Sequence, residues 1–98
     1  MRVAIIGSGI SGLYAAHQLS RHCDLTIFEA DSRPGGHSHT VDVAMDGKHL
    51  AMDTGFLVFN ERNYPHFTAL LKSLGVAYQP ADMSFSFRCA FRGLEYRG

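Results

Sequence analysis

The sequence predicts an α/β fold that begins with a βαβ unit. Residues 2–6 are a short β-branched apolar run that stops at a glycine, which is typical of a buried strand in a parallel sheet. Residues 10–21 place apolar side chains on one broad helical face, and residues 24–29 contain a second short apolar run. A strand, a helix and a strand within so short a stretch form a right-handed βαβ unit.

A hairpin and a second helix are expected next. Asp46-Gly47 is a strong turn dipeptide, and it separates two candidate strands at residues 40–44 and 48–52. Residues 65–74 carry a helical apolar stripe, begin with a proline and are followed by a glycine, so they predict a helix.

The last part of the chain predicts another hairpin. Residues 83–87 alternate between apolar and polar side chains as a strand does, and Arg92-Gly93 is a candidate turn before residues 94–96. We expect these strands to start an antiparallel sheet.

Composition limits the function classes. The chain has 98 residues, about one small domain, and its nine basic residues balance nine acidic ones. This balance gives no electrostatic footprint for nucleic acid. The apolar runs are too short for an integral membrane segment, and the first residues lack a signal peptide pattern, so a cytoplasmic protein is expected. Cys23 and Cys89 are expected to be reduced, packed thiols, and no oligomeric state is indicated.

The sequence Gly7-Ser8-Gly9-Ile10-Ser11-Gly12 is a G-x-G-x-x-G motif. Such a turn allows a tight exit from a strand, a close approach of a pyrophosphate and close packing of the helix on the strand. Because it lies between a predicted strand and a predicted helix, it predicts dinucleotide phosphates at the helix N-terminus. The candidate ligands are Gly7, Gly9, Ile10, Ser11 and Gly12. A purely structural turn is the alternative.

Glu29 is the candidate ribose ligand. It ends the second predicted strand, where a carboxylate can accept hydrogen bonds from ribose hydroxyls and would repel a 2′-phosphate. We place Ala30 in the same site. A solvated acid at the end of a strand is the alternative.

Residues 29–36 then add an E-x-x-x-R-x-G-G pattern through Glu29, Arg33, Gly35 and Gly36. This pattern resembles the fingerprint of the flavin-containing amine oxidase superfamily, a group of FAD/NAD(P)-binding Rossmann-like oxidoreductases. The resemblance implies FAD, with Arg33 near the pyrophosphate or adenosine and the glycine pair near the ribityl phosphate. An ordinary surface turn is the alternative.

Residues 36–42, 52–60 and 64–65 narrow the resemblance. They are similar to a bacterial amine-oxidase-like branch and to the N-terminal region of plant cyclopropane fatty acid synthases. The resemblance implies that Gly55 and Phe56 lie near the isoalloxazine, although Phe56 could simply be core. His37 is expected at the flavin phosphate or ring, or else in solvent, and no metal site is expected.

The resemblance implies the N-terminal FAD-binding portion of a flavin-dependent oxidoreductase, in which a small-molecule substrate gives a hydride to flavin N5. Residues 1–60 would be the FAD-binding Rossmann-like segment, and residues 61–98 a helix and the first strands of a substrate domain. We expect these 98 residues to be an incomplete part of the parent enzyme, and they offer no assignable catalytic residue. A non-catalytic FAD-binding module and a plain NAD-binding domain remain as alternatives, and the substrate and electron acceptor stay open.

Overall fold

A computed structural model describes all 98 residues, which form two compact units, Met1–Leu57 and Val58–Gly98. Each unit is described by itself. The assignment of residues 1–60 to FAD binding and of residues 61–98 to a substrate domain stays a prediction. No helix has the length and apolar character needed to cross a bilayer.

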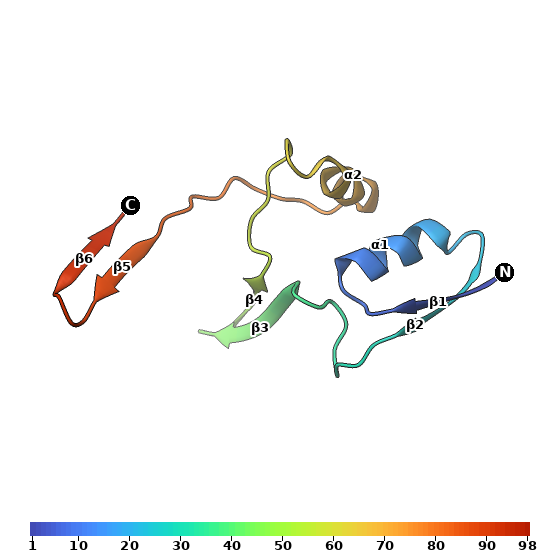
Figure 1. Ribbon diagram of the computed structural model, residues 1–98, viewed down its shortest axis with the longest axis horizontal. Coiled ribbons are helices and arrows are strands. Elements are labelled where there is room, and N and C mark those ends of the chain that lie inside the picture. Colours follow the sequence, from blue (N-terminus) through green and yellow to red (C-terminus); the bar gives the residue numbers. More distant parts are fainter. The chain divides into compact units, whose positions relative to one another are not determined.

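The first unit begins with the predicted βαβ arrangement (Figure 1). Strand β1 (Arg2–Ile6) pairs in parallel with β2 (Asp24–Phe28), and helix α1 (Ile10–Leu19) connects them and packs on both. The helix ends two residues earlier than predicted. Ser20 is its C-cap, and residues 20–22 form a turn before β2.

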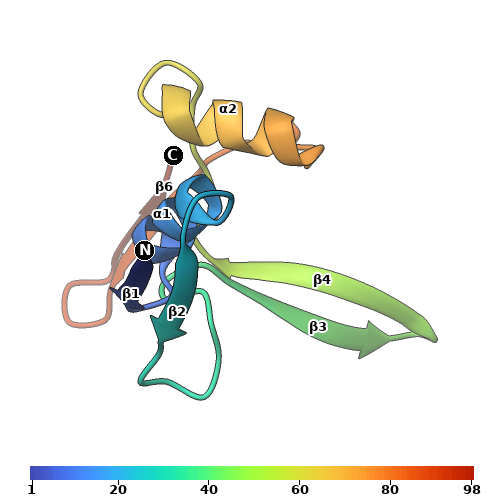
Figure 2. The ribbon, with the colours of Figure 1, turned by 90° about the vertical axis from the view of Figure 1, so that its right-hand side faces the viewer.

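The first unit ends with a long antiparallel hairpin, which Figure 2 shows as an extended ribbon. Its strands are β3 (His39–Met45) and β4 (Lys48–Gly55), longer than predicted at their outer ends. Asp46 and Gly47 both have positive φ angles, 53° and 72°, as the expected two-residue hairpin turn requires.

The second unit holds helix α2 (Pro65–Leu74), followed by Gly75 in the left-handed conformation, as predicted. Strands β5 (Ser86–Cys89) and β6 (Leu94–Arg97) form an antiparallel hairpin. The strand expected at residues 83–87 therefore starts and ends later. Pairing with β6 explains the difference, because the first pair of the hairpin is Ser86 with Arg97. Beyond that pair, one more hydrogen bond runs from the Gly98 N–H to the Phe85 carbonyl.

The expectation of buried strands is wrong for this chain. No hydrophobic side chain is buried, and Ile6 and Phe28 in the first sheet are 81% and 54% exposed. The reason is architectural, since each sheet has two strands and only the β1–β2 sheet has a helix packed on it. The two buried residues are polar: Ser8 and Thr68.

Candidate functional site

In the glycine turn after β1, Gly12 is tightly enclosed, whereas Gly7 and Gly9 have open space where a Cβ would lie. Gly7 has a φ of 94° and donates its N–H to the Phe28 carbonyl at 2.7 Å. A Cβ on Gly12 would lie 2.0 Å from the Gly7 carbonyl oxygen, so no side chain fits there. A Cβ on Gly9 would meet nothing within 4 Å. Gly12 is thus required by packing, whereas the space at Gly9 is available to a ligand.

The N-terminus of α1 opens onto this space. Gly9 is the N-cap, no side chain caps the helix, and its first turn has no acidic residue. The first N–H groups of a helix have no partner within the helix and carry its positive dipole end. Ile10 and Ser11, two of the predicted ligands, are the first residues of this turn. An anionic group is therefore the ligand that this end of the helix favours.

The Glu29 carboxylate lies beside the same turn and accepts three hydrogen bonds. Both the N–H and the hydroxyl of Ser8 donate to its Oε2, at 2.7 and 2.5 Å, and the Asp31 N–H donates to Oε1 at 3.0 Å. The Ser8 hydroxyl, followed by the Asp31 N–H and the Ser8 N–H, lowers the pKa of Glu29 to about 2. The carboxylate is thus ionised and oriented at neutral pH.

Arg33 makes its side-chain hydrogen bonds within its own loop, and its place near the pyrophosphate or adenosine stays a prediction. Its Nη1 donates to the carbonyls of Pro34 and Ser38, each at 3.2 Å, and its Nη2 donates to the Gly36 carbonyl at 2.7 Å. Here the guanidinium clamps its own loop, and this gives the arginine of the motif a structural task.

The glycine pair brings this loop against the glycine turn. The Gly35 N–H donates to the Ser8 carbonyl at 2.8 Å, and a Cβ on Gly36 would lie 3.0 Å from the Cα of Gly9. Gly35 and Gly36 have φ angles of 113° and 61°, which favour glycine. The two motifs, far apart in sequence, therefore form one surface.

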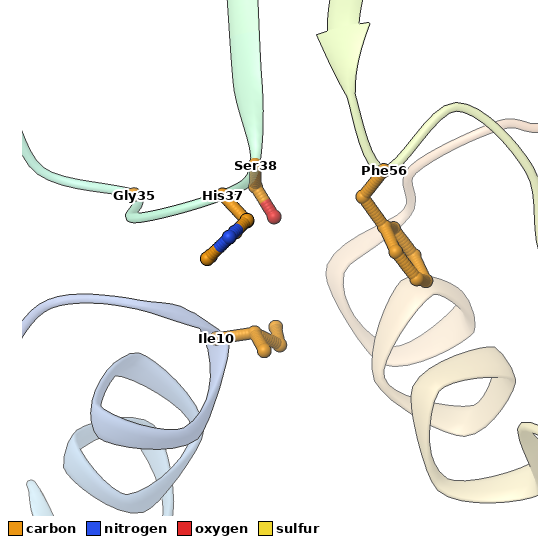
Figure 3. Close-up of a pocket in the computed structure, with 5 residues that line it drawn as sticks. All are labelled: Ile10, Gly35, His37, Ser38 and Phe56. Atoms are coloured by element: carbon orange, nitrogen blue, oxygen red, sulfur yellow. The ribbon is translucent and has the colours of Figure 1, made fainter.

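A pocket of about 140 Å³ lies next to this surface (Figure 3). Figure 3 shows the side chains of Ile10, His37, Ser38 and Phe56 around a common space, and Gly35 completes the lining. Whole small-molecule sites usually measure roughly 300–1,000 Å³, so this pocket is smaller than a whole site.

The backbone of Gly55 and Phe56 shapes this pocket. A Cβ on Gly55 would lie 1.8 Å from the His37 carbonyl oxygen, so the end of β4 lies directly against the loop. Phe56 has a φ of 54°, which is uncommon for a residue other than glycine. The structure thus brings Gly55, Phe56 and His37 together, and Phe56 is 44% exposed, not core.

The remaining candidates of the sequence add little. Ala30 directly follows Glu29, and its backbone is the smallest of the causes that lower the pKa of the Glu29 carboxyl group. No group of three or more His, Cys, Asp or Glu residues could hold a metal ion, and Cys23 and Cys89 are free, half-buried thiols.

Sequence reasoning missed two residues, Ser8 and Ser38. Ser8 occupies a position that the glycine motif leaves unspecified. The motif therefore gives no reason to prefer a hydroxyl side chain there. Ser38 belongs to the candidate site only because it lines the pocket. A small hydroxyl side chain between two motif glycines, with an acid after the next strand, is the signal that could have indicated Ser8.

Several known oxidases are similar to this chain. The chain is 42% identical over 76 residues to protoporphyrinogen oxidase 2 of Arabidopsis thaliana, covering 76% of the chain and 14% of that protein. It is 57% identical over 37 residues to coproporphyrinogen III oxidase of Staphylococcus aureus, covering 35% of the chain and 8% of that protein. A solved putrescine oxidase variant with redesigned cofactor binding covers 99% of the chain with a TM-score of 0.56 and 26% identity.

These relatives are much longer than the chain, which spans 14% of the first and 21% of the putrescine oxidase. The likenesses confirm the predicted Rossmann-like α/β fold and the resemblance to flavin-containing amine oxidases. The narrower branch stays a prediction. Residues 5–74 match the family model described as NAD(P)-binding Rossmann-like domain, and the chain belongs to that family.

Proposed function

We propose that this chain binds FAD through its adenosine diphosphate half, as the N-terminal part of a flavin-dependent oxidoreductase. The observation that carries the proposal is the open space at Gly9. It lies at the uncapped N-terminus of α1 and beside the oriented Glu29 carboxylate. A pyrophosphate needs the first feature and an adenosine ribose needs the second.

Each residue then has a distinct task. Gly9 admits the pyrophosphate, and the N–H groups at Ile10, Ser11 and Gly12 face its negative charge. Glu29 accepts a hydrogen bond from the adenosine ribose. None of these groups moves a proton or breaks a bond, so we assign them to binding and assign no catalytic residue.

The loop that contains Arg33 and the pocket beside it would contact the flavin half of the cofactor. Arg33 fixes the loop, and its glycine pair exposes backbone close to the turn. Ile10, His37 and Phe56 offer a largely apolar wall of the kind that a flavin ring contacts. When bound, the flavin supplies the redox chemistry, with hydride transfer from a small-molecule substrate to N5.

The oxidoreductase activity would belong to a longer polypeptide. Two features support this part of the proposal: the relatives are several times longer than the chain, and the apolar faces of its small sheets are exposed. Porphyrinogens and putrescine appear in the names of the relatives, and we propose only that the substrate is a small organic molecule that is oxidised.

A plain NAD-binding domain is the second candidate, because the matching family model is described by NAD(P) binding. Titration of the 98-residue chain with FAD and with NAD, each followed by calorimetry, separates the two. We expect FAD to bind more tightly, with ADP as a competitor. Binding of NAD with no binding of FAD would contradict the proposal.

A non-catalytic FAD module is separated by a second experiment on the full-length parent protein. Anaerobic addition of a substrate should bleach the visible band of oxidised flavin in an enzyme, and no candidate substrate should do so in a module.

A further inference from the structure

Ser8 has an unusual position for a residue that the glycine motif leaves unspecified. It is 3% exposed, and it is one of two buried polar residues in the chain. Its hydroxyl and its N–H both donate to the same oxygen, Oε2 of Glu29. A buried hydroxyl that found no acceptor would destabilise the fold, so this contact is an integral part of the turn.

Two donors from one residue give the carboxylate a defined orientation. A free glutamate side chain rotates about several bonds, and fixing those rotations before a ligand arrives removes part of the entropy cost of binding. The Asp31 N–H holds the other oxygen, Oε1. A carboxylate oxygen has two acceptor positions, and both positions of Oε2 are taken by Ser8. A sugar hydroxyl would therefore approach Oε1.

The hydroxyl of Ser8 also keeps Glu29 ionised to a lower pH than an ordinary glutamate. It is the largest of the causes that lower the pKa of this carboxyl group, ahead of the backbone donors. An ionised carboxylate is a stronger acceptor for a sugar hydroxyl than a protonated one.

We propose that Ser8 is a positioning residue of the nucleotide site, whose hydroxyl orients Glu29 to accept a ribose hydroxyl of an adenosine nucleotide. The proposal rests on the proposed function for its ligand, and on the contacts of Ser8 alone for the orientation of Glu29. It gives a side-chain role to one residue of a motif whose other proposed ligand contacts are made by the backbone.

The first arm of the test needs no ligand. Carbon-detected NMR follows the titration of the Glu29 carboxyl group in the wild-type chain and in Ser8→Ala, Ser8→Cys and Ser20→Ala. The pKa of Glu29 should rise from about 2 toward its ordinary 4.5 in Ser8→Ala. Ser8→Cys, which keeps a weak donor of similar size, should lie between. Ser20→Ala is the matched control, because its hydroxyl bonds to the His17 carbonyl at the other end of α1.

The second arm measures binding by calorimetry, with ADP and 2′,3′-dideoxy-ADP as probes. Ser8→Ala should weaken ADP by up to about tenfold, because the Glu29 side chain must then be ordered when the ribose binds. The same substitution should change the affinity of the dideoxy probe much less, because that probe lacks the sugar hydroxyls. A general loss of structure would weaken both probes alike.

The outcomes are distinct. An unchanged titration of Glu29 in Ser8→Ala overturns the proposal, and so does equal weakening of both probes. If the wild-type chain binds no ADP, the proposed function fails. The titration then decides by itself whether Ser8 orients Glu29.

Discussion

Different kinds of contact stabilise the interior of each of the two units. In Met1–Leu57 the closest contacts are polar or backbone contacts: Ser8 to Glu29, Arg33 to three carbonyls, and glycines against carbonyl oxygens. In Val58–Gly98 aromatic rings contact one another, beside hydrogen bonds such as that from the Tyr78 hydroxyl to Glu61. Phe59 has edge-on contacts with Phe67 at 5.0 Å and with Tyr78 at 5.1 Å between ring centroids.

This difference explains why the candidate site is well defined in so small a chain. Hydrogen bonds and backbone contacts are directional and short-ranged, so they set the shape of a loop without a large core. Aromatic packing gains most of its free energy from surface removed from water, and the rings of the second unit remain partly exposed. We therefore expect substitutions to act locally within each unit and through different mechanisms.

The largest effect is expected for Gly12→Ala. The added Cβ would meet the Gly7 carbonyl oxygen at 2.0 Å, and this backbone group has little room to adjust. We expect a loss of about 3 kcal/mol or more in the stability of the first unit, the upper range for overpacking. Hydrogen exchange of the β1 and β2 amides measures it. Unchanged protection would show that the turn is not close-packed.

Phe59→Ala should be the largest perturbation of the second unit. Phe59 is half-buried and contacts Phe67 and Tyr78, so its removal should cost about 2 kcal/mol through lost area and ring contacts. Hydrogen exchange of the α2 amides should increase, while that of β1 and β2 stays the same. Equal destabilisation of both units would contradict the local account.

Gly9→Ala is the counterpart of Gly12→Ala within the same motif. Its Cβ would meet no atom of the protein, and its φ of −71° suits any residue, so the stability should barely change. The methyl group would occupy the space proposed for the pyrophosphate. We expect ADP affinity to fall about tenfold or more, roughly 1.4 kcal/mol, in calorimetric titration. Normal ADP binding would remove Gly9 from the site.

The smallest expected effect is a pH dependence of the first unit. The pKa of Glu29 is lowered to about 2 from 4.5, so its hydrogen bonds stabilise the fold fully above pH 4.5. That contribution is lost as the pH falls from about 4.5 toward 2, when the folded form takes up a proton less readily than the unfolded chain. Thermal unfolding of the wild-type chain and Glu29→Gln should therefore converge at low pH. If the unfolding temperatures of the two proteins changed in parallel with pH, the lowered pKa of Glu29 would be contradicted.

Much of the fold follows from local sequence signals. The strands, the two helices and the Asp46-Gly47 turn depend on short-range patterns, and the structure confirms them. Burial was wrongly predicted, because an apolar run such as residues 2–6 becomes a buried strand only when other elements cover it. The later start of β5 also depends on a partner, since pairing with β6 sets the register.

The candidate site divides in the same way. The glycines could be singled out because their backbone tasks are tied to a motif, and Glu29 because of its place after a strand. The sequence could not predict the contacts of Ser8 or the hydrogen bonds of Arg33 to its own loop. These contacts depend on side-chain rotamers and on the path of the loop.

The most direct test of the proposed site is to map where an adenosine nucleotide contacts the chain. Amide chemical shifts of the 98-residue protein, recorded while ADP is added, report this residue by residue. The account predicts the largest changes at Gly9, Ser11, Gly12 and Glu29, with much smaller ones in α2 and in the β5–β6 hairpin. Changes centred on the second unit, or none at the glycine turn, would contradict it.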